Sequence, residues 1–116
     1  MMNVISKDNA QHYTWGEVCD GWHLLKMDHL SVIQERVPPG AAEQRHYHQH
    51  SHQFFFVLSG QATLEVDEQT LILGAQQGLS VAPQQAHRLR NDSDQDLIFI
   101  VVSAPKSHGD RVLVDY

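Results

Sequence analysis

The chain is poor in several features that would point to a particular class of protein. It has one cysteine, Cys19, which excludes an internal disulfide framework and fits a reducing compartment. No apolar run approaches the roughly 20 residues that a membrane-spanning helix needs. The opening stretch MMNVISKDNAQHYTW lacks the apolar segment of a secretory signal. We therefore expect a cytoplasmic protein with no membrane partner.

Positive charge is also scarce. Eight Lys and Arg residues against 14 Asp and Glu residues give a formal net charge of −6, with the nine histidines counted as neutral. Because nucleic acids and anionic membranes repel an acidic surface, neither is an expected partner. The histidines would offset this charge only below about pH 6.5, where an unperturbed imidazole becomes protonated.

Long helical patterns, repeats and linkers are absent as well. No segment of ten or more residues shows a clear 3.6-residue periodicity, and no low-complexity tract divides the chain. The length of 116 residues and the hydrophobic content of 41% suit one domain with one core. We expect a single domain that spans residues 1–116.

Short strand-like runs separated by turn residues make up most of the sequence. They lie at 21–27, 30–37, 53–60, 61–66, 70–73, 79–83, 86–91 and 96–103. Turn signals at this spacing predict an all-β sandwich or barrel. The last run, DLIFIVVS, is apolar at both strand parities, which predicts a strand that is covered on both faces.

The run RHYHQHSHQFFFVLSG at 45–60 places histidines at positions 46, 48, 50 and 52. It is internal and interrupted, so it is not an expression tag. The spacing alone leaves two readings open: a solvated surface patch, or a cluster of metal ligands. Phe55 and Val57 share one strand face and Phe54 and Phe56 the other, so one of the two pairs must point into the barrel.

Strand geometry limits how these histidines can act together. Residues two apart share a face and lie about 6.6 Å apart, so His46 and His48 can converge on one ion. His46 and His52 would be about 20 Å apart in an extended chain, whereas metal–nitrogen bonds are about 2.1 Å long. Either the chain turns near 49–51, or His50 and His52 have another role.

Five residues between positions 40 and 60 follow a pattern that resembles the first motif of the cupin superfamily. These residues are Gly40, His46, His48, Gln53 and Gly60. The departure is Gln53, because this motif usually carries glutamate there.

A second stretch, GLSVAPQQAHRLRN at 78–91, resembles the second cupin motif and contributes Gly78, Pro83, His87 and Asn91. This match is looser in two respects. Residues 82–84 are Ala-Pro-Gln, where the motif usually has proline-x-glycine. Gly78 also lies about two residues nearer His87 than that motif places it. The closing stretch SAPKSHGDRV at 103–112 also resembles the tail of small, single-domain bacterial cupins.

This resemblance implies a double-stranded β-helix, or jelly-roll barrel, with a metal ion inside. The ligand positions that it carries over are His46, His48, Gln53 and His87. Three imidazoles and one oxygen, with coordination positions left open, are typical of a catalytic rather than a closed structural site. A divalent transition metal is the expected cofactor, with zinc, nickel, iron, copper or manganese as candidates, whereas calcium and magnesium do not suit such ligands.

Glutamine at position 53 changes the chemistry of such a site. With four neutral ligands a divalent ion keeps a charge near +2, which makes it a stronger Lewis acid and favours an anionic ligand. Gln53 itself cannot act as a general base. Two arrangements remain open: Gln53 binds the ion directly, or it holds a ligated water while His50 or His52 completes the coordination sphere.

Three classes of function are compatible with these residues. The first is a metal-dependent enzyme acting on a small molecule, of dioxygenase, isomerase or cyclase type. The second is a non-catalytic module that binds a metal or a small ligand. The third is a metal-free sugar-modifying cupin, which would need a carboxylate partner for its histidine and basic residues in the cavity. We favour the first, by analogy with other proteins of this fold, because open coordination positions serve chemistry.

Two further expectations concern the surroundings of the site. A small jelly roll exposes sheet edges, and pairing them between subunits hides them, so we expect a homodimer. Asn91 is expected to cap a turn rather than to contact a substrate, and residues 107–110 are expected to form a turn.

Overall fold

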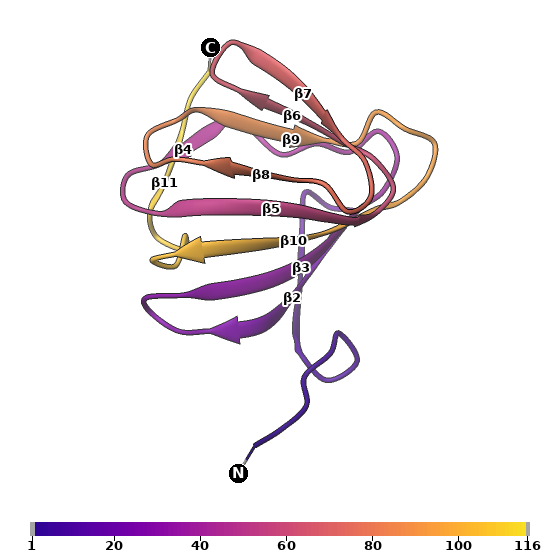
Figure 1. The fold of residues 1–116 in the computed structure, drawn as a ribbon, viewed down its shortest axis with the longest axis vertical. Helices are drawn as coiled ribbons and strands as arrows, with labels where there is room; N and C mark the ends of the chain where they lie inside the picture. The colour runs from indigo at the N-terminus through magenta and orange to yellow at the C-terminus, as the bar shows by residue number, and fades with distance from the viewer. Residues whose placement is uncertain (1, 116) are drawn as a thin grey trace.

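The structure is a computed structural model that describes residues 2–115, which form eleven strands and no helix (Figure 1). The strands make two sheets that face each other. The six-stranded sheet has, in spatial order, β1 (Gln11–Trp15), β2 (Cys19–Lys26), β3 (Ser31–Val37), β10 (Leu97–Ala104), β5 (His52–Ser59) and β8 (Gly78–Val81). The five-stranded sheet has β11 (Arg111–Leu113), β4 (His46–His48), β9 (His87–Arg90), β6 (Ala62–Val66) and β7 (Gln69–Leu73).

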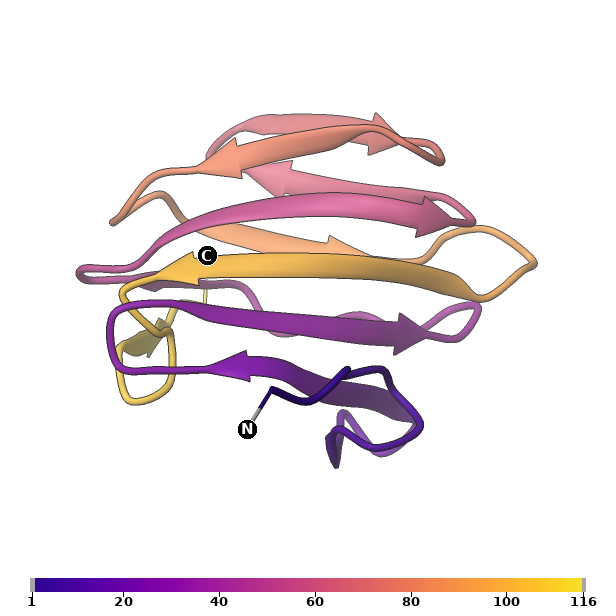
Figure 2. The same cartoon turned by 60° about the horizontal axis from the view of Figure 1, so that its bottom comes forward.

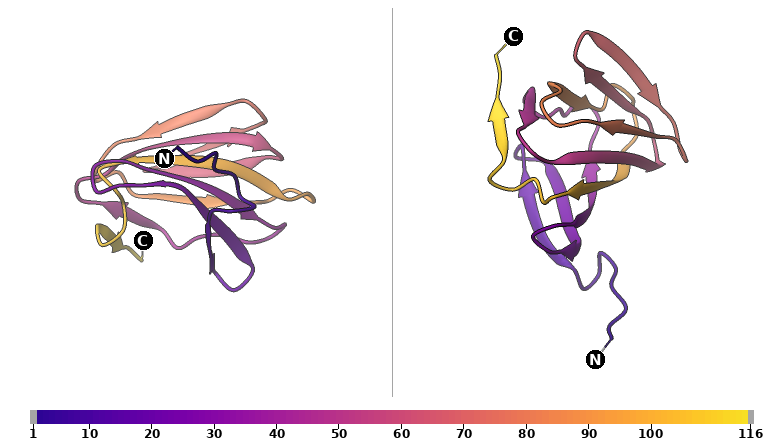
Figure 3. Two further views of the ribbon diagram at one scale, coloured as in Figure 1. Left: turned by 90° about the horizontal axis from the view of Figure 1, so that it is seen from below. Right: turned by 60° about the vertical axis from the view of Figure 1, so that its left-hand side comes forward.

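All eight strand-like runs of the sequence are strands, and the predicted all-β architecture is confirmed. Of the other three strands, β4 carries the first two residues of the histidine run, and two had no clear sequence signal. β1 lies in a stretch of ambiguous pattern, and β11 is a three-residue strand in the tail. β11 pairs antiparallel with β4, with Arg111 opposite His48, and it runs beside β4 in Figure 3. Within residues 2–115 no helix is long and apolar enough to cross a membrane.

The core lies between the two sheets, where the inward-facing residues of each strand meet. On β5 the alternation buries Gln53, Phe55 and Val57, so Phe55 and Val57 are the pair that faces inward. On β4 it buries His46 and His48 while Tyr47 faces outward. The most deeply buried large side chains include Phe99, Leu64, Leu89, Leu97 and Val37. The period-two pattern thus places the histidines on the same face as the apolar core.

The prediction that 96–103 is covered on both faces is only half right. β10 lies between β3 and β5, well inside the six-stranded sheet seen in Figure 2. Its inward residues are buried, but Ile98, Ile100 and Val102 on the outer face are only partly buried. On neighbouring β5, Phe54 is 43% exposed and stacks on Phe56. The outer face of these two strands is therefore apolar and incompletely covered in the single chain.

Two residues of the motifs, Gly60 and Asn91, stabilise turns and do not belong to the candidate ligand set. Gly60 follows β5 with a φ of 85°, and a Cβ atom there would collide with the backbone of Asp96. Asn91 is fully buried, and its Nδ2 donates to the carbonyl oxygens of Val37 (2.8 Å) and Gln95 (2.7 Å). Its Oδ1 accepts from the backbone N–H of Ser93 at 3.0 Å. The expected turn-capping role of Asn91 is confirmed.

Candidate metal centre

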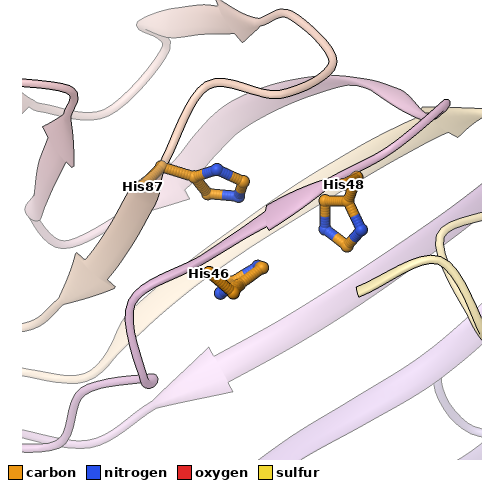
Figure 4. Close-up of side chains that lie close together, drawn as sticks. All are labelled: His46, His48 and His87. Carbon is orange, nitrogen blue, oxygen red and sulfur yellow. The ribbon is translucent and has the colours of Figure 1, made fainter. Parts of the chain in front are cut away.

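Three histidines meet at the inner face of the five-stranded sheet. His46 and His48 stand on β4, and His87 begins β9 directly opposite His46 in the antiparallel pair. One ring nitrogen from each lies within 4.8 Å of the corresponding atoms of the other two. Figure 4 shows the imidazoles of the two strands turned toward a common space. All three are buried, with at most 5% of their surface exposed.

Hydrogen bonds to the main chain orient two of these rings. His46 Nδ1 lies 2.7 Å from the carbonyl oxygen of Gln44, and His87 Nδ1 lies 2.9 Å from that of Gln85. A carbonyl oxygen only accepts, so each Nδ1 carries the proton and each Nε2 keeps a free lone pair. His87 Nε2 is buried and has no hydrogen-bond partner among residues 2–115. This is the tautomer that a metal-binding histidine adopts.

Burial keeps the cluster neutral. It is the main cause that lowers the pKa of His46 to about 3 and the pKa of His48 to about 4. Burial also lowers the pKa of His87. The neighbouring imidazoles and the Arg111 guanidinium add to these shifts. Neutral imidazole is the form that binds a metal ion, so the cluster needs no deprotonation near pH 7.

Gln53 faces the same space from the opposite sheet. Its side chain is 6% exposed, and its Nε2 donates to Ser103 Oγ at 3.1 Å. Its Oε1 is buried and has no hydrogen-bond partner in the described chain. Gln53, His46 and His48 line one cavity. Gln53 therefore presents an unpaired buried acceptor in the cavity that His46 and His48 also line.

His50 and His52 lie outside this cluster. Both are exposed. The chain turns at 49–51, where the Asp110 carboxylate accepts the backbone N–H groups of Gln49, His50 and Ser51. His52 points to the other side of β5, with its Nε2 2.6 Å from Ser80 Oγ. The arrangement in which His50 or His52 completes the coordination sphere therefore has no support in the geometry.

Comparison with known proteins identifies the family. A family model described as "Cupin domain" matches residues 33–103, which is more than half of the chain and includes both histidine motifs. This chain is a cupin. The family predicted from the two motifs is confirmed, and so is the double-stranded β-helix fold.

Two solved structures share the fold of this cupin although their sequence identity to it is low. A protein with a double-stranded β-helix domain from Klebsiella pneumoniae is 21% identical, covers 100% of both chains and superposes with a TM-score of 0.82. The polyketide cyclase RemF from Streptomyces resistomycificus is 17% identical, covers 100% of this chain and 87% of its own, and gives a TM-score of 0.84. At these identities the likeness establishes the fold alone.

One curated relative shares more sequence over a shorter stretch. The polyketide synthase CurC from Streptomyces cyaneus is 33% identical over 67 residues. The match covers 58% of this chain and 44% of that protein, so this cupin spans under half the length of its relative.

The cavity of this cupin has a volume of about 290 Å³ and holds several residues that sequence reasoning missed. Its lining includes Tyr13, Trp15, Ile33, Glu35, Glu43, His46, His48, Gln53, Phe55, Val101, Ser107, His108, Gly109 and Arg111. Residues 107–110 form the expected turn, but the turn also closes one side of the cavity. A wider depression of about 760 Å³ beside β7 and β8 contains none of the three histidines. The smaller cavity is the candidate site because three of the four potential ligands, His46, His48 and Gln53, line it.

For one of the cavity residues that sequence analysis missed, the alternation of the strand could have predicted that its side chain faces inward. Glu35 alternates with Ile33 and Val37, both buried, so a carboxyl group falls on the inner face of β3. No comparable signal was available for Tyr13 or Arg111, which reach the cavity from strands that the sequence did not define.

Acid should destabilise the metal-free protein through the buried histidines. The pKa of His48 is about 4 in the folded chain against about 6.5 for an unperturbed histidine, so between these values the unfolded chain binds more protons. The free energy of unfolding therefore falls as the pH falls. Between pH 6.5 and 5.5, His48 should account for about 1 kcal/mol of this loss. Chemical unfolding of chelator-treated wild-type and His48→Gln proteins measures the difference.

The exposed His50→Gln variant is the matched control and should lose as much stability as the wild type over this range. Equal losses in His48→Gln and wild type would contradict the burial of a neutral imidazole at position 48.

Proposed function

We propose that this cupin binds one divalent transition metal ion through His46, His48, Gln53 and His87 and uses it in converting a small molecule. The observation that carries this proposal is the pair of unpaired acceptors, His87 Nε2 and Gln53 Oε1, buried beside the other two imidazoles. An unpaired buried polar atom costs about 1–3 kcal/mol. A bound cation would offset that cost at both atoms at once.

The donor set indicates the kind of ion and the kind of ligand. Three imidazole nitrogens and one amide oxygen suit zinc, nickel, iron, copper or manganese, and their neutrality leaves the full charge of the ion to attract an anionic group. When bound, such an ion supplies Lewis acidity. Ile33, Phe55 and Val101 give the cavity apolar walls, and its volume of about 290 Å³ limits the substrate to a small molecule.

The metal-free, sugar-modifying alternative requires a histidine paired with a carboxylate. In this chain His46 and His87 each pair through Nδ1 with a main-chain carbonyl oxygen instead. The similarity to a polyketide synthase and to a polyketide cyclase fits an enzyme that acts on a small organic molecule. These points favour metal-dependent chemistry over the sugar-modifying alternative. A non-catalytic binding module would hold the same ion but convert no substrate, so turnover distinguishes it.

Metal content tests the ligand set directly. Purified wild-type protein should contain about one transition metal ion per chain by elemental analysis. His87→Ala removes an imidazole that is 1% exposed and should reduce metal content below about a tenth of the wild-type value. The His50→Ala variant, changed at an exposed position, should retain the metal. Stoichiometric metal in folded His87→Ala protein would refute the ligand set.

The role of Gln53 has its own test. Gln53→Glu adds a negative charge at the proposed ligand atom and should slow release of the ion to a chelator by about tenfold or more. Gln49→Glu makes the same change in charge at an exposed position and is the matched control. If both variants release the ion at the wild-type rate, Gln53 does not contact it.

We also propose a homodimer that buries the outer face of β5 and β10. This face carries Phe54, Phe56, Ile98, Ile100 and Val102, which the single chain leaves partly or largely exposed. A second copy would cover these apolar side chains, and burying them is favourable at about 25 cal/mol per Å².

Sedimentation should give twice the chain mass for the wild type and the single-chain mass for Phe54→Asp. Ile72→Asp makes the same kind of change at a residue of β7 that is 62% exposed and should remain a dimer. A monomeric wild-type protein would contradict this assembly.

A further inference from the structure

Two carboxyl groups face the cavity and have no role in the proposed ligand set. Glu35 lies on β3 among residues of the inner face, and Glu43 lies in the segment before β4. Both line the cavity with His46 and His48. Neither glutamate belongs to the group of side chains whose ligand atoms converge, which within residues 2–115 consists of the three histidines. Among residues 2–115 no other carboxyl group lines this cavity, and position 53 carries an amide.

Each carboxyl group is held by one oxygen and leaves the other oxygen free. The Tyr13 hydroxyl donates to Glu35 Oε2 at 2.7 Å, and the backbone N–H of Leu89 donates to Glu43 Oε1 at 2.9 Å. The second oxygen of each group has no hydrogen-bond partner among residues 2–115, and it is not a fully buried atom. Each glutamate is thus held through one oxygen and keeps the other unpaired, and both side chains line the cavity, although Glu43 also borders a surface depression beside Arg88.

The charges around the pair come from several elements. Arg111 of β11 faces both carboxyl groups, and Arg88 of β9 acts on Glu43. Tyr13 of β1 contacts Glu35, and His46, His48 and His108 share the cavity. No cation forms an ion pair with either glutamate in the described chain, where the ion pairs involve other carboxylates.

This setting favours the retention of a proton on the pair. Burial raises the pKa of Glu35 to about 7, and the hydrogen bond from Tyr13 limits that rise. Burial, followed by the charge of Glu35, raises the pKa of Glu43 to about 8. The pKa of Tyr13 is raised as well, so its hydroxyl remains a donor. Near neutral pH the interacting pair therefore keeps about one proton, and the hydrogen bond that Tyr13 donates to Glu35 favours that glutamate as the carboxylate.

We propose that Glu35 and Glu43 are the catalytic base and acid of this cavity and that they transfer protons to and from a small carbonyl compound held at the metal centre. This inference rests on the proposed function, since it takes the three histidines and Gln53 as the substrate-anchoring side of the cavity. It assigns the reaction to enolisation, the step shared by isomerisations and by cyclisations that proceed through an enol.

The step balances without any oxidant. The Glu35 carboxylate removes a proton from the carbon next to the substrate carbonyl, and the electrons of that C–H bond form a carbon–carbon double bond. The π electrons of the carbonyl group move to its oxygen, which takes the proton of the Glu43 carboxylic acid. The pair begins and ends with one proton, now on Glu35. Where the carbon next to the carbonyl carries a hydroxyl group, the Glu43 carboxylate can then take the proton of that hydroxyl while Glu35 protonates the former carbonyl carbon, and this completes an isomerisation. A base and an acid with pKa values near the working pH suit this exchange.

The first part of the test uses the metal-free protein and needs no substrate. Carbon-13 labelling of the glutamate side chains lets NMR follow each carboxyl group through a pH titration. Two glutamates should titrate above pH 6, and Glu43→Gln should lower the midpoint of Glu35, because the two groups interact. Glu17 and Glu68, which are exposed, serve as internal references. Titration of Glu35 and Glu43 below pH 5 would overturn the proposal.

The second part measures proton transfer itself in metal-loaded protein. Pyruvate, 2-oxobutanoate and pentane-2,4-dione serve as probes, and NMR in heavy water records deuterium entering the carbon next to the carbonyl group. Wild-type protein should accelerate this exchange for at least one probe, and Glu35→Gln should slow it by about 10²–10⁴-fold with unchanged metal content. Glu68→Gln removes an exposed carboxyl group and should exchange at the wild-type rate.

The outcomes separate this inference from the metal proposal. Full metal content with no exchange of any probe, or with full exchange in Glu35→Gln, would overturn the acid–base pair and leave the metal centre standing. Wild-type protein that fails to bind a transition metal would instead refute the proposed function, while the titration of the metal-free protein would still report on the two carboxyl groups.

Discussion

The pairing of β4 with β9 is the contact on which the site depends. It sets His46 opposite His87, and the two-residue spacing on β4 brings His48 to the same face. A shift of one residue in this register would turn β4 or β9 over and carry its imidazoles to the outer surface. The backbone hydrogen bonds of a short ladder thus decide whether three histidines form one cluster. β11 pairs with the other edge of β4 and helps to hold that strand in place.

Burial gives the cavity its electrostatic character. The same loss of water that keeps His46 and His48 neutral also keeps a proton on Glu43, so imidazoles and carboxyl groups both favour their uncharged forms. A cavity with neutral imidazoles on one wall and carboxyl groups that retain a proton on another could accept a cation without a fixed anionic partner. Gln53 is consistent with this balance, because a glutamate there would add a third carboxyl group to a space that already holds two.

Several structural features could be predicted from the sequence of a single strand or turn. Alternation within β4 and β5 predicted which histidines and which phenylalanines would share a face. The length of an extended chain left open either a turn near 49–51 or another role for His50 and His52, and in the structure the chain turns there while both histidines lie outside the cluster. The role of Asn91 was also predictable, since a buried amide near a cluster of turn residues has main-chain partners close at hand. The prediction for β10 was half right, because apolar residues at both parities do not reveal whether the second face is covered by the same chain.

The sequence by itself determined most of the strands, the alternation that places His46 and His48 on one face, and the family, because these depend on spacing along the chain. The tertiary structure decided which distant residues share the cavity with them. Tyr13, Glu43 and Arg111 come from β1, a loop and β11, which have no regular pattern that would reveal their neighbours. Their meeting depends on long-range strand pairing and on the packing of two sheets. Periodicity within one segment carries no information about either.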